Sequence, residues 1–205
     1  SRPTTLKQRY RAAGHTLLRV SRLRQHDIDQ QLLEELLIAV KGALSDTDLL
    51  IFSDFNYGSL PQGLVDAVTD ECTRRGIPMV ADSQSSSQIG DVSRFKGMML
   101  LTPTEREARL AVRDFRSGLV VLAEKLRKKA RAETIIMTLG NEGSMGHAPS
   151  TESDKWLTDR LAAMSTAPRD PAGAGDSLLT CASMAMAVGA DMWQSMYLGS
   201  VAAAC

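Results

Sequence analysis

Four short apolar runs, separated by helix-like segments, constrain the fold of this chain most strongly. They cover residues 49–52, 77–81, 98–101 and 134–139. Each run is short and holds β-favouring residues, so we expect strands that are buried on both faces. Buried strands that alternate with helices form a parallel sheet with right-handed crossovers and helices on both faces. The predicted fold class is therefore α/β with a mostly parallel sheet.

Helix signals lie between the apolar runs. The predicted helices cover residues 30–44, 61–76 and 117–131, and a further helix begins at residue 104. Asp29 is placed to cap the first helix, whose Leu and Val side chains recur along one stripe. Pro61 opens the second helix and Gly76 closes it, which is the usual polarity of these two residue types. The helix over residues 117–131 is amphipathic and has a basic face.

The charges balance overall but not along the chain. Lys plus Arg and Asp plus Glu each number 24, so no global field favours a nucleic-acid partner. Two predicted strands, over residues 4–11 and 16–23, lie in a basic β segment, residues 1–26, that suits an anionic ligand. It has no acidic residue, and its basic residues are Arg2, Lys7, Arg9, Arg11, Arg19, Arg22 and Arg24. Tyr10 is its only aromatic residue, which disfavours stacking of nucleic-acid bases, although a polyanion binder stays open as a third alternative.

The cysteines and histidines do not form a metal pattern. Cys72, Cys181 and Cys205 are an odd, scattered set, which fits a reducing compartment. The three His residues share no ligand spacing, and we expect them at the surface or in loops. No stretch of about 18 apolar residues is long enough to span a bilayer. We therefore expect a cytoplasmic protein without a membrane partner.

Polar residues follow the predicted strands at their carboxyl ends. They are Asp54, Asp82, Thr102 with Thr104 and Glu107, and Thr138 with Gly140. In open parallel sheets, ligands bind in the crevice outside the carboxyl ends of the strands. These side chains are therefore predicted to lie along one edge of the sheet and to face one binding site.

Residues 173–176, Gly-Ala-Gly-Asp, directly precede a helical stretch predicted over residues 177–188. Two glycines around an alanine let a ligand approach the backbone closely, and a helix N-terminus presents unpaired N–H groups to an anion. A phosphate site is one interpretation. The alternative is an ordinary helix start, with Asp176 in the first turn and small residues for close packing. No Gly-Lys-Ser/Thr occurs, and Leu178 stands where a dinucleotide fingerprint needs Gly, so other phosphate motifs are excluded.

Residues 170–176, D-P-A-G-A-G-D, resemble the D-x-x-G-A-G-D signature of the PfkB (ribokinase-like) family of carbohydrate kinases. The resemblance implies that the chain folds as a ribokinase-like three-layer sandwich. It also implies that the protein uses ATP and Mg²⁺. It implies that Asp176 is the catalytic base and that the backbone of Gly173, Ala174 and Gly175 holds the transferring phosphate. Asp170, at the start of the signature, is expected on the nucleotide side.

Two further segments resemble the same family. Residues 101–108, L-T-P-T-E-R-E-A, are similar to its L-T-P-N-x-x-E-A segment, which implies that Glu107 binds the metal through water. Thr104 replaces the usual Asn, and Thr104 with Glu107 also forms a capping box that needs no ligand. Residues 138–143, T-L-G-N-E-G, are similar to a T-x-G-x-x-G turn, which places Thr138, Gly140 and Gly143 beside the nucleotide. The alternative is a Gly turn into a strand over residues 144–147.

Two segments resemble the heptose 7-phosphate kinase subgroup of this family. Residues 53–58, S-D-F-N-Y-G, are similar to its D-Y-x-K-G segment, and residues 2–9, R-P-T-T-L-K-Q-R, to its R-P-T-x-x-K-x-R segment. The resemblance implies that Asp54, Lys7 and Arg9 bind the substrate. A solvated basic strand is the alternative for the last two. The chain departs from the subgroup at Asn56, Tyr57 and Gln84.

The resemblance implies an ATP-dependent sugar kinase that phosphorylates a hydroxyl of a sugar or of a sugar phosphate such as heptose 7-phosphate. A non-catalytic sugar- or nucleotide-binding protein on a kinase scaffold is the alternative, and the departures from the family pattern favour it. The resemblance also implies that residues 1–205 are part of one kinase domain. Its N-terminal sugar-binding segment would precede Ser1, and its C-terminal end would follow Cys205. A homodimer is left open.

Overall fold

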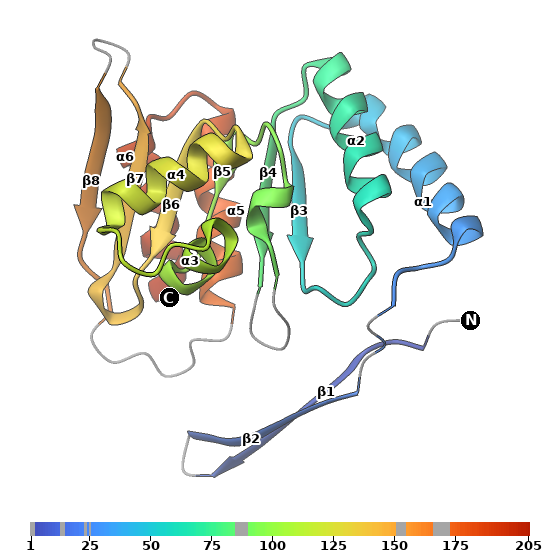
Figure 1. The fold of residues 1–205 in the computed structure, drawn as a ribbon, viewed down its shortest axis with the longest axis horizontal. Coiled ribbons are helices and arrows are strands. Elements are labelled where there is room, and N and C mark those ends of the chain that lie inside the picture. The colour runs from blue at the N-terminus through green and yellow to red at the C-terminus, as the bar shows by residue number, and fades with distance from the viewer. Residues whose placement is uncertain are drawn as a thin grey trace.

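The computed structural model describes residues 3–12, 15–22, 24, 26–84, 90–150, 155–165 and 173–205. It shows a six-stranded sheet between two layers of helices, and a separate two-stranded sheet (Figure 1). The strands are β1 Leu6–Ala12, β2 His15–Arg22, β3 Leu50–Asp54, β4 Met79–Ser83, β5 Leu100–Leu101, β6 Thr134–Thr138, β7 Ser144–Pro149 and β8 Trp156–Leu161. The helices are α1 Gln30–Ala43, α2 Gln62–Arg75, α3 Glu105–Val112, α4 Leu119–Ala130, α5 Ala174–Ala187 and α6 Met192–Ala204, with short 3₁₀ turns between them.

The strand order explains the layers. The six strands follow one another in chain order, and β3 to β6 run parallel. Right-handed crossovers in one direction put their connecting helices on one face of the sheet. α1 to α4 accordingly pack on one face, and α5 and α6 cover the other, behind the sheet in Figure 1. The predicted α/β layering with helices on both faces is confirmed.

Two hydrophobic cores follow from this layering. The larger one joins α2, α3 and α4 to residues such as Phe52, Ala81, Leu101 and Ile135. The smaller one joins α5 and α6 to Val80, Leu100 and Ile136, whose side chains point to the opposite face. Successive side chains of a strand alternate between faces, so each central strand contributes to both cores. This is why the sequence shows continuous apolar runs rather than an alternating pattern.

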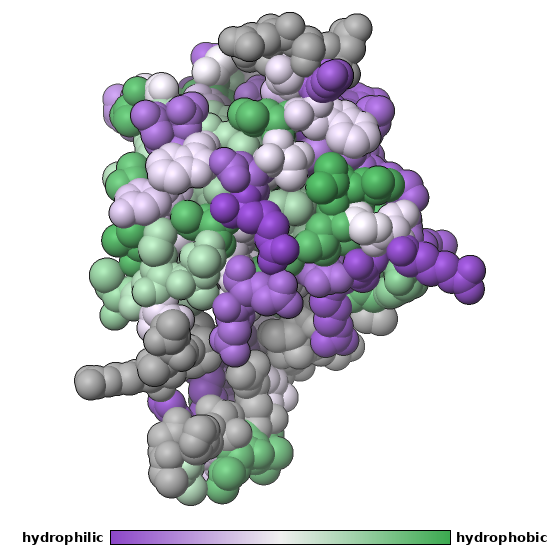
Figure 2. Space-filling model, turned by 90° about the vertical axis from the view of Figure 1, so that its left-hand side faces the viewer, coloured by the Kyte–Doolittle hydropathy of each residue, from purple (hydrophilic) through white to green (hydrophobic). Residues whose placement is uncertain are grey.

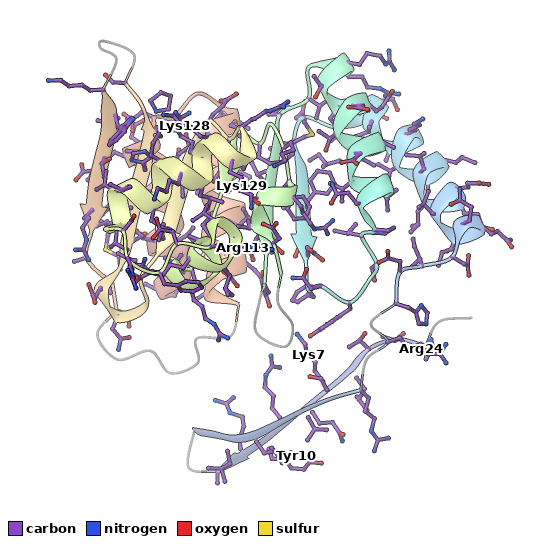
Figure 3. All side chains as sticks on the ribbon, viewed as in Figure 1. Lys7, Tyr10, Arg24, Arg113, Lys128 and Lys129 are labelled. Atoms are coloured by element: carbon purple, nitrogen blue, oxygen red, sulfur yellow. The ribbon has the colours of Figure 1, made fainter. Side chains whose placement is uncertain are left out.

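The helix signals were correct. Asp29 caps α1, with its carboxylate accepting from the backbone N–H of Leu32 at 2.9 Å. Gly76 ends α2 in the left-handed region, at φ 71°. The exposed side of α4 is basic, with Lys128 and Lys129 labelled along it in Figure 3.

The strand given as an alternative over residues 144–147 is confirmed as β7, but the strand predictions missed its antiparallel pairing and the whole of β8. β7 and β8 extend the sheet in antiparallel fashion beyond β6, and nothing in the sequence analysis indicated β8. β8 is an edge strand with mostly exposed side chains, so it lacks the apolar run that marks a buried strand. Figure 2 views this edge and shows hydrophilic residues between groups of hydrophobic ones. Charged residues such as Asp159 and Arg160 protect an edge strand from pairing with another chain.

The expectation that all histidines lie at the surface or in loops was wrong for His147. This residue lies on β7 and is fully buried. Its Nε2 is 3.1 Å from Oε2 of Glu124 on α4, and its Nδ1 is 2.7 Å from Oγ1 of Thr158 on β8. A carboxylate only accepts, so the neutral ring carries its proton on Nε2 and accepts from Thr158 at Nδ1. The sequence could not show this, because the three partners meet only in the fold.

Glu124 and His147 have pKa values shifted by these surroundings. Burial opposes ionisation of Glu124, but hydrogen bonds from Arg127, His147 and Lys128 outweigh it and lower the pKa to about 2. Burial lowers the pKa of His147 from its ordinary 6.5, against the effect of Glu124. The hydrogen bonds between Glu124, His147 and Thr158, here called the Glu124–His147 network, join α4 to the antiparallel strands β7 and β8.

Among the described residues, no helix combines the length and the apolar character needed to cross a membrane.

We expect the Glu124–His147 network to make the fold sensitive to acid. Both pKa values are lower in the folded state than in the unfolded chain, so the unfolded chain binds more protons. The free energy of unfolding therefore decreases as the pH is lowered. The stabilisation from His147 is fully present above pH 6.5 and is lost as the pH falls through the folded-state pKa of this residue. The stabilisation from Glu124 is fully present above pH 4.5 and is lost as the pH falls towards about 2. Glu124→Gln should cost about 3 kcal/mol at neutral pH and flatten the acid dependence.

The measurement is thermal or urea unfolding of the full-length protein between neutral pH and about pH 2, which covers the range in which both groups titrate. The exposed Glu133 provides a control, and Glu133→Gln should leave both stability and its pH dependence unchanged. A Glu124→Gln protein with wild-type stability and pH dependence would show that the network contributes nothing.

Candidate active site

Side-chain alternation along a strand decides on which face of the sheet each polar residue at the strand ends lies. Val80 and Leu100 point towards α5 and α6, so Asp82 and Thr102, two residues further on, lie on the same face. Thr138 follows Ile136 in the same way. Asp82 and Thr102 are buried, whereas Thr138 is half-buried. Alternation therefore brings Asp82 and Thr102 to the face covered by α5, whereas Asp54 lies on the opposite face; that all these side chains face one binding site stays a prediction.

Asp82 lies in a strongly acidic environment. Burial, together with the nearby charges of Glu107, Asp176 and Asp54, raises its pKa to about 7, against a backbone hydrogen bond from Ser83. α5, whose first turn holds Asp176, packs against β4. An acidic group with like charges around it favours a bound cation or a proton.

The N-terminus of α5 is open. Gly173 is its N-cap residue, at φ 91°, and no described side chain caps the helix. The first backbone bond of the helix runs from Ser177 N–H to the Gly173 carbonyl, at 2.9 Å. The N–H groups of Ala174, Gly175 and Asp176 precede this bond and have no partner within the helix.

Gly175 is not required by the local structure. Its φ lies outside the left-handed region, and a Cβ added there would meet no described atom within 4 Å. The alternative that small residues serve close packing is therefore unsupported for Gly175. Asp176 lies half-buried in the first turn, and its carboxylate makes no hydrogen bond with a described residue. Asp170 lies outside the described residues.

Asp54 is engaged within the protein. It lies on the face of Phe52, opposite to Asp82, and is 4% exposed. Its Oδ2 is 2.8 Å from the Arg94 guanidinium, and its Oδ1 accepts from the backbone N–H of Asn56 at 2.8 Å. Asn56 is itself in the left-handed region, at φ 57°, and its amide donates to the Gln84 carbonyl at 2.6 Å. Substrate binding by Asp54 stays a prediction, beside this internal role.

Thr104 and Glu107 form the complete capping box. The Glu107 carboxylate accepts from the backbone N–H of Thr104 at 2.9 Å and from its hydroxyl at 2.8 Å. The Thr104 hydroxyl accepts in turn from the backbone N–H of Glu107 at 3.2 Å. The structural alternative for this pair is thus confirmed, and metal binding by Glu107 through water stays a prediction. Glu107 is 8% exposed and contributes charge to the environment of Asp82.

The two glycines of the turn after β6 have different surroundings. Gly140 is at φ 61°, with open space where a Cβ would be. Gly143 is at φ 92°, and a Cβ there would lie 2.0 Å from the Leu161 carbonyl oxygen. Gly143 is therefore required by the packing of this turn against the end of β8. Thr138 and Gly140 line a pocket of about 420 Å³ on the α3 side of the strand ends, and Asp176 does not line it.

The pocket contains a residue that the sequence analysis did not single out. Arg106 lines it from the first turn of α3, and its guanidinium makes no hydrogen bond or ion pair with a described residue. A cation is unfavourable at a helix N-terminus unless an anion accompanies it. Glu105 and Glu107 flank Arg106 in the same turn and accompany its charge, so no local sequence signal marked Arg106 as a site residue.

Lys7 and Arg9 lie on the β1–β2 hairpin, apart from the six-stranded sheet. Figure 3 shows Lys7 where the hairpin comes closest to the α/β body, and Tyr10 farther along it. The Lys7 ammonium lies 4.7 Å from the ring centroid of Phe55 and 5.0 Å from that of Tyr57. Arg9 is paired with Arg19 in the hairpin register. Substrate binding by Lys7 and Arg9 stays a prediction.

Metal binding by protein groups alone is not supported. In the part of the chain that the structure describes, no cluster of three or more His, Cys, Asp or Glu side chains is arranged to hold a metal ion. Magnesium usually binds to one or two carboxylates and completes its shell with water and phosphate oxygens. Asp82 and its acidic neighbours fit that kind of site.

Similar proteins share both the sequence pattern and the fold. Curated relatives include a bifunctional protein HldE from Desulfatibacillum aliphaticivorans, 28% identical, and one from Methylobacillus flagellatus, 30% identical. Each alignment covers 98% of this chain but only 40% of the relative, so the chain spans about two fifths of their length.

Solved structures give the same fold. Phosphofructokinase-2 from Escherichia coli aligns with a TM-score of 0.74 at 16% identity, over 98% of this chain and 63% of that one. Ribokinase from Thermotoga maritima aligns with a TM-score of 0.59 at 21% identity, over 80% of this chain and 51% of that one. The predicted ribokinase-like fold is therefore confirmed. A family model for pfkB family carbohydrate kinases matches residues 2–205, and the chain belongs to that family.

Proposed function

We propose that the protein transfers the γ-phosphoryl group of ATP to a hydroxyl of a sugar or sugar phosphate. The observation that carries this proposal is the open N-terminus of α5 beside the acidic end of β4. Phosphoryl transfer needs in-line positioning and charge stabilisation rather than covalent chemistry. The N–H groups of Ala174, Gly175 and Asp176 are suited to stabilise the phosphoryl group in transit. Asp176 is suited to orient the attacking hydroxyl and to accept its proton.

The acidic surroundings of Asp82 fit a magnesium nucleotide. Burial and the charges of Glu107 and Asp176 oppose ionisation of Asp82, and a bound cation would favour its charged form. Magnesium, when bound with the nucleotide, neutralises charge on the phosphates. We assign its water-mediated contact to Glu107, and Thr138 and Gly140 to the nucleotide side, where they line the pocket with Arg106.

The acceptor is proposed to be a phosphorylated sugar of the heptose 7-phosphate kind. Residues 2–9 and 53–58 carry this proposal by their resemblance to that subgroup. The structure brings the two segments together, because Lys7 lies over the rings of Phe55 and Tyr57. A substrate phosphate between the hairpin and this loop would meet Lys7 and Arg9. Placement of residues 1–205 within one longer kinase domain, a cytoplasmic location and a homodimer stay predictions.

A non-catalytic sugar- or nucleotide-binding protein is the second candidate. One observation favours it: the Thr104 hydroxyl, at the family's Asn position, is engaged in the capping box at both its donor and its acceptor side. ATP turnover separates the two candidates directly. A full-length protein that binds Mg·ATP but consumes none with any sugar or sugar phosphate would support the second.

We expect Asp176→Asn to reduce turnover by about 10²-fold or more while nucleotide affinity stays within a few-fold of wild type. Loss of a general base and orienting group has an effect of this size. The measurement is ATP consumption with a sugar phosphate acceptor, beside calorimetric binding of Mg·ADP. Turnover within a few-fold of wild type would remove Asp176 from the mechanism.

We expect Gly175→Ala to keep or raise the stability of the protein and to lower its turnover. Alanine is favoured over glycine inside a helix by about 1 kcal/mol, and no described atom obstructs its methyl group, so the variant should unfold at an equal or higher temperature. The methyl group should nevertheless obstruct the phosphate, so turnover should fall by at least about tenfold. Lower stability together with lower turnover would instead indicate that Gly175 serves packing.

Lys7→Ala and Arg9→Ala should raise the KM for a sugar phosphate by about tenfold each, because charged hydrogen bonds to the phosphate are lost. The KM for ATP should change little. Gln8 lies between them on the opposite face of β1, so Gln8→Ala is the matched control and should change neither constant. Unchanged constants in all three variants would mean that the hairpin cations are solvated or only structural.

A further inference from the structure

Thr102 carries a buried hydroxyl for which the described protein offers no partner. The residue follows β5 directly and is 5% exposed, and its Oγ1 makes no hydrogen bond with any described residue. A buried hydroxyl without a partner destabilises a fold, and native proteins satisfy nearly all such groups. Valine has nearly the same shape without this disadvantage. An orphaned threonine at this position therefore indicates a partner that arrives with a ligand.

The location of Thr102 identifies that ligand's site. β5 lies between β4 and β6, so Thr102 lies between the ends that carry Asp82 and Thr138. Like Asp82, it lies two residues after a side chain that packs against α5, and Asp176 lies in the first turn of that helix. Two other buried hydroxyls lack a described partner, Thr69 on α2 and Ser195 on α6. Only Thr102 among these three lies at a carboxyl end of a central strand.

Resting on the proposed kinase function, we propose that the Thr102 hydroxyl binds an oxygen atom brought by the magnesium nucleotide. The oxygen belongs either to a phosphate or to a water bound to the magnesium. A phosphate oxygen is a strong acceptor for the hydroxyl proton, and a metal-bound water is a strong donor to the hydroxyl oxygen. Thr102 is thus a ligand-binding residue, separate from Asp176, and its hydroxyl gains its partner when the nucleotide binds.

Thermal unfolding and calorimetric binding of Mg·ADP to the full-length protein test this. Without nucleotide, Thr102→Val should be at least as stable as wild type, because no internal hydrogen bond is lost. Its affinity for Mg·ADP should fall by about tenfold. Thr102→Ser keeps the hydroxyl and should restore most of the affinity. Thr69→Val is the matched control, because it removes an equally orphaned hydroxyl away from the site, and its affinity should equal that of wild type.

The magnesium dependence distinguishes the two sources of the oxygen. A loss that persists with ADP and a chelator supports a phosphate oxygen, and a loss confined to Mg·ADP supports a metal-bound water. Two results would overturn the inference alone: equal Mg·ADP affinity in wild type and Thr102→Val, or a Thr102→Val protein clearly less stable than wild type without nucleotide. A wild-type protein that does not bind Mg·ADP would overturn the proposed function as well.

Discussion

Side-chain alternation along the central strands is the constraint on which the rest of this structure depends. Val80 and Leu100 hold α5 and α6 against one face of the sheet. The same alternation carries Asp82 and Thr102 to that face, at the edge where α5 begins. A slip of one residue would carry Asp82 and Thr102 to the opposite face, away from α5, so the core and the site are specified together. Asp54 lies on the opposite face, where it pairs with Arg94 instead.

The site is the part of the fold where ordinary requirements for stability are relaxed. α5 begins at a glycine with no described side-chain cap, as α4 does, but only the start of α5 lies on the face that carries Asp82 and Thr102. Acidic groups gather around Asp82 and raise its pKa, and Thr102 holds a buried hydroxyl without a described partner. Each of these features destabilises the chain without a ligand, and each would be relieved by a magnesium nucleotide. Local rules of folding are most often broken where a protein binds something.

The antiparallel end of the sheet and the hairpin serve different purposes. β7 and β8 are joined to α4 by the buried Glu124–His147–Thr158 hydrogen bonds, which lie away from the strand ends and act on stability. The β1–β2 hairpin has no such buried polar network among the described residues; Lys7 meets Phe55 and Tyr57 through cation–π contacts. Such contacts contribute little where the groups remain partly exposed.

The sequence by itself determined the fold class, most helix boundaries and the residues at the carboxyl ends of the strands. These features depend on local periodicity, capping residues and glycine positions, which act over a few residues. Only the tertiary structure decided what those residues touch. It showed that Asp54 belongs to an internal ion pair, that Gly143 is required by Leu161, and that Glu107 caps its own helix. It also buried His147 and revealed β8, because an exposed edge strand and a long-range hydrogen bond leave no local pattern in a sequence.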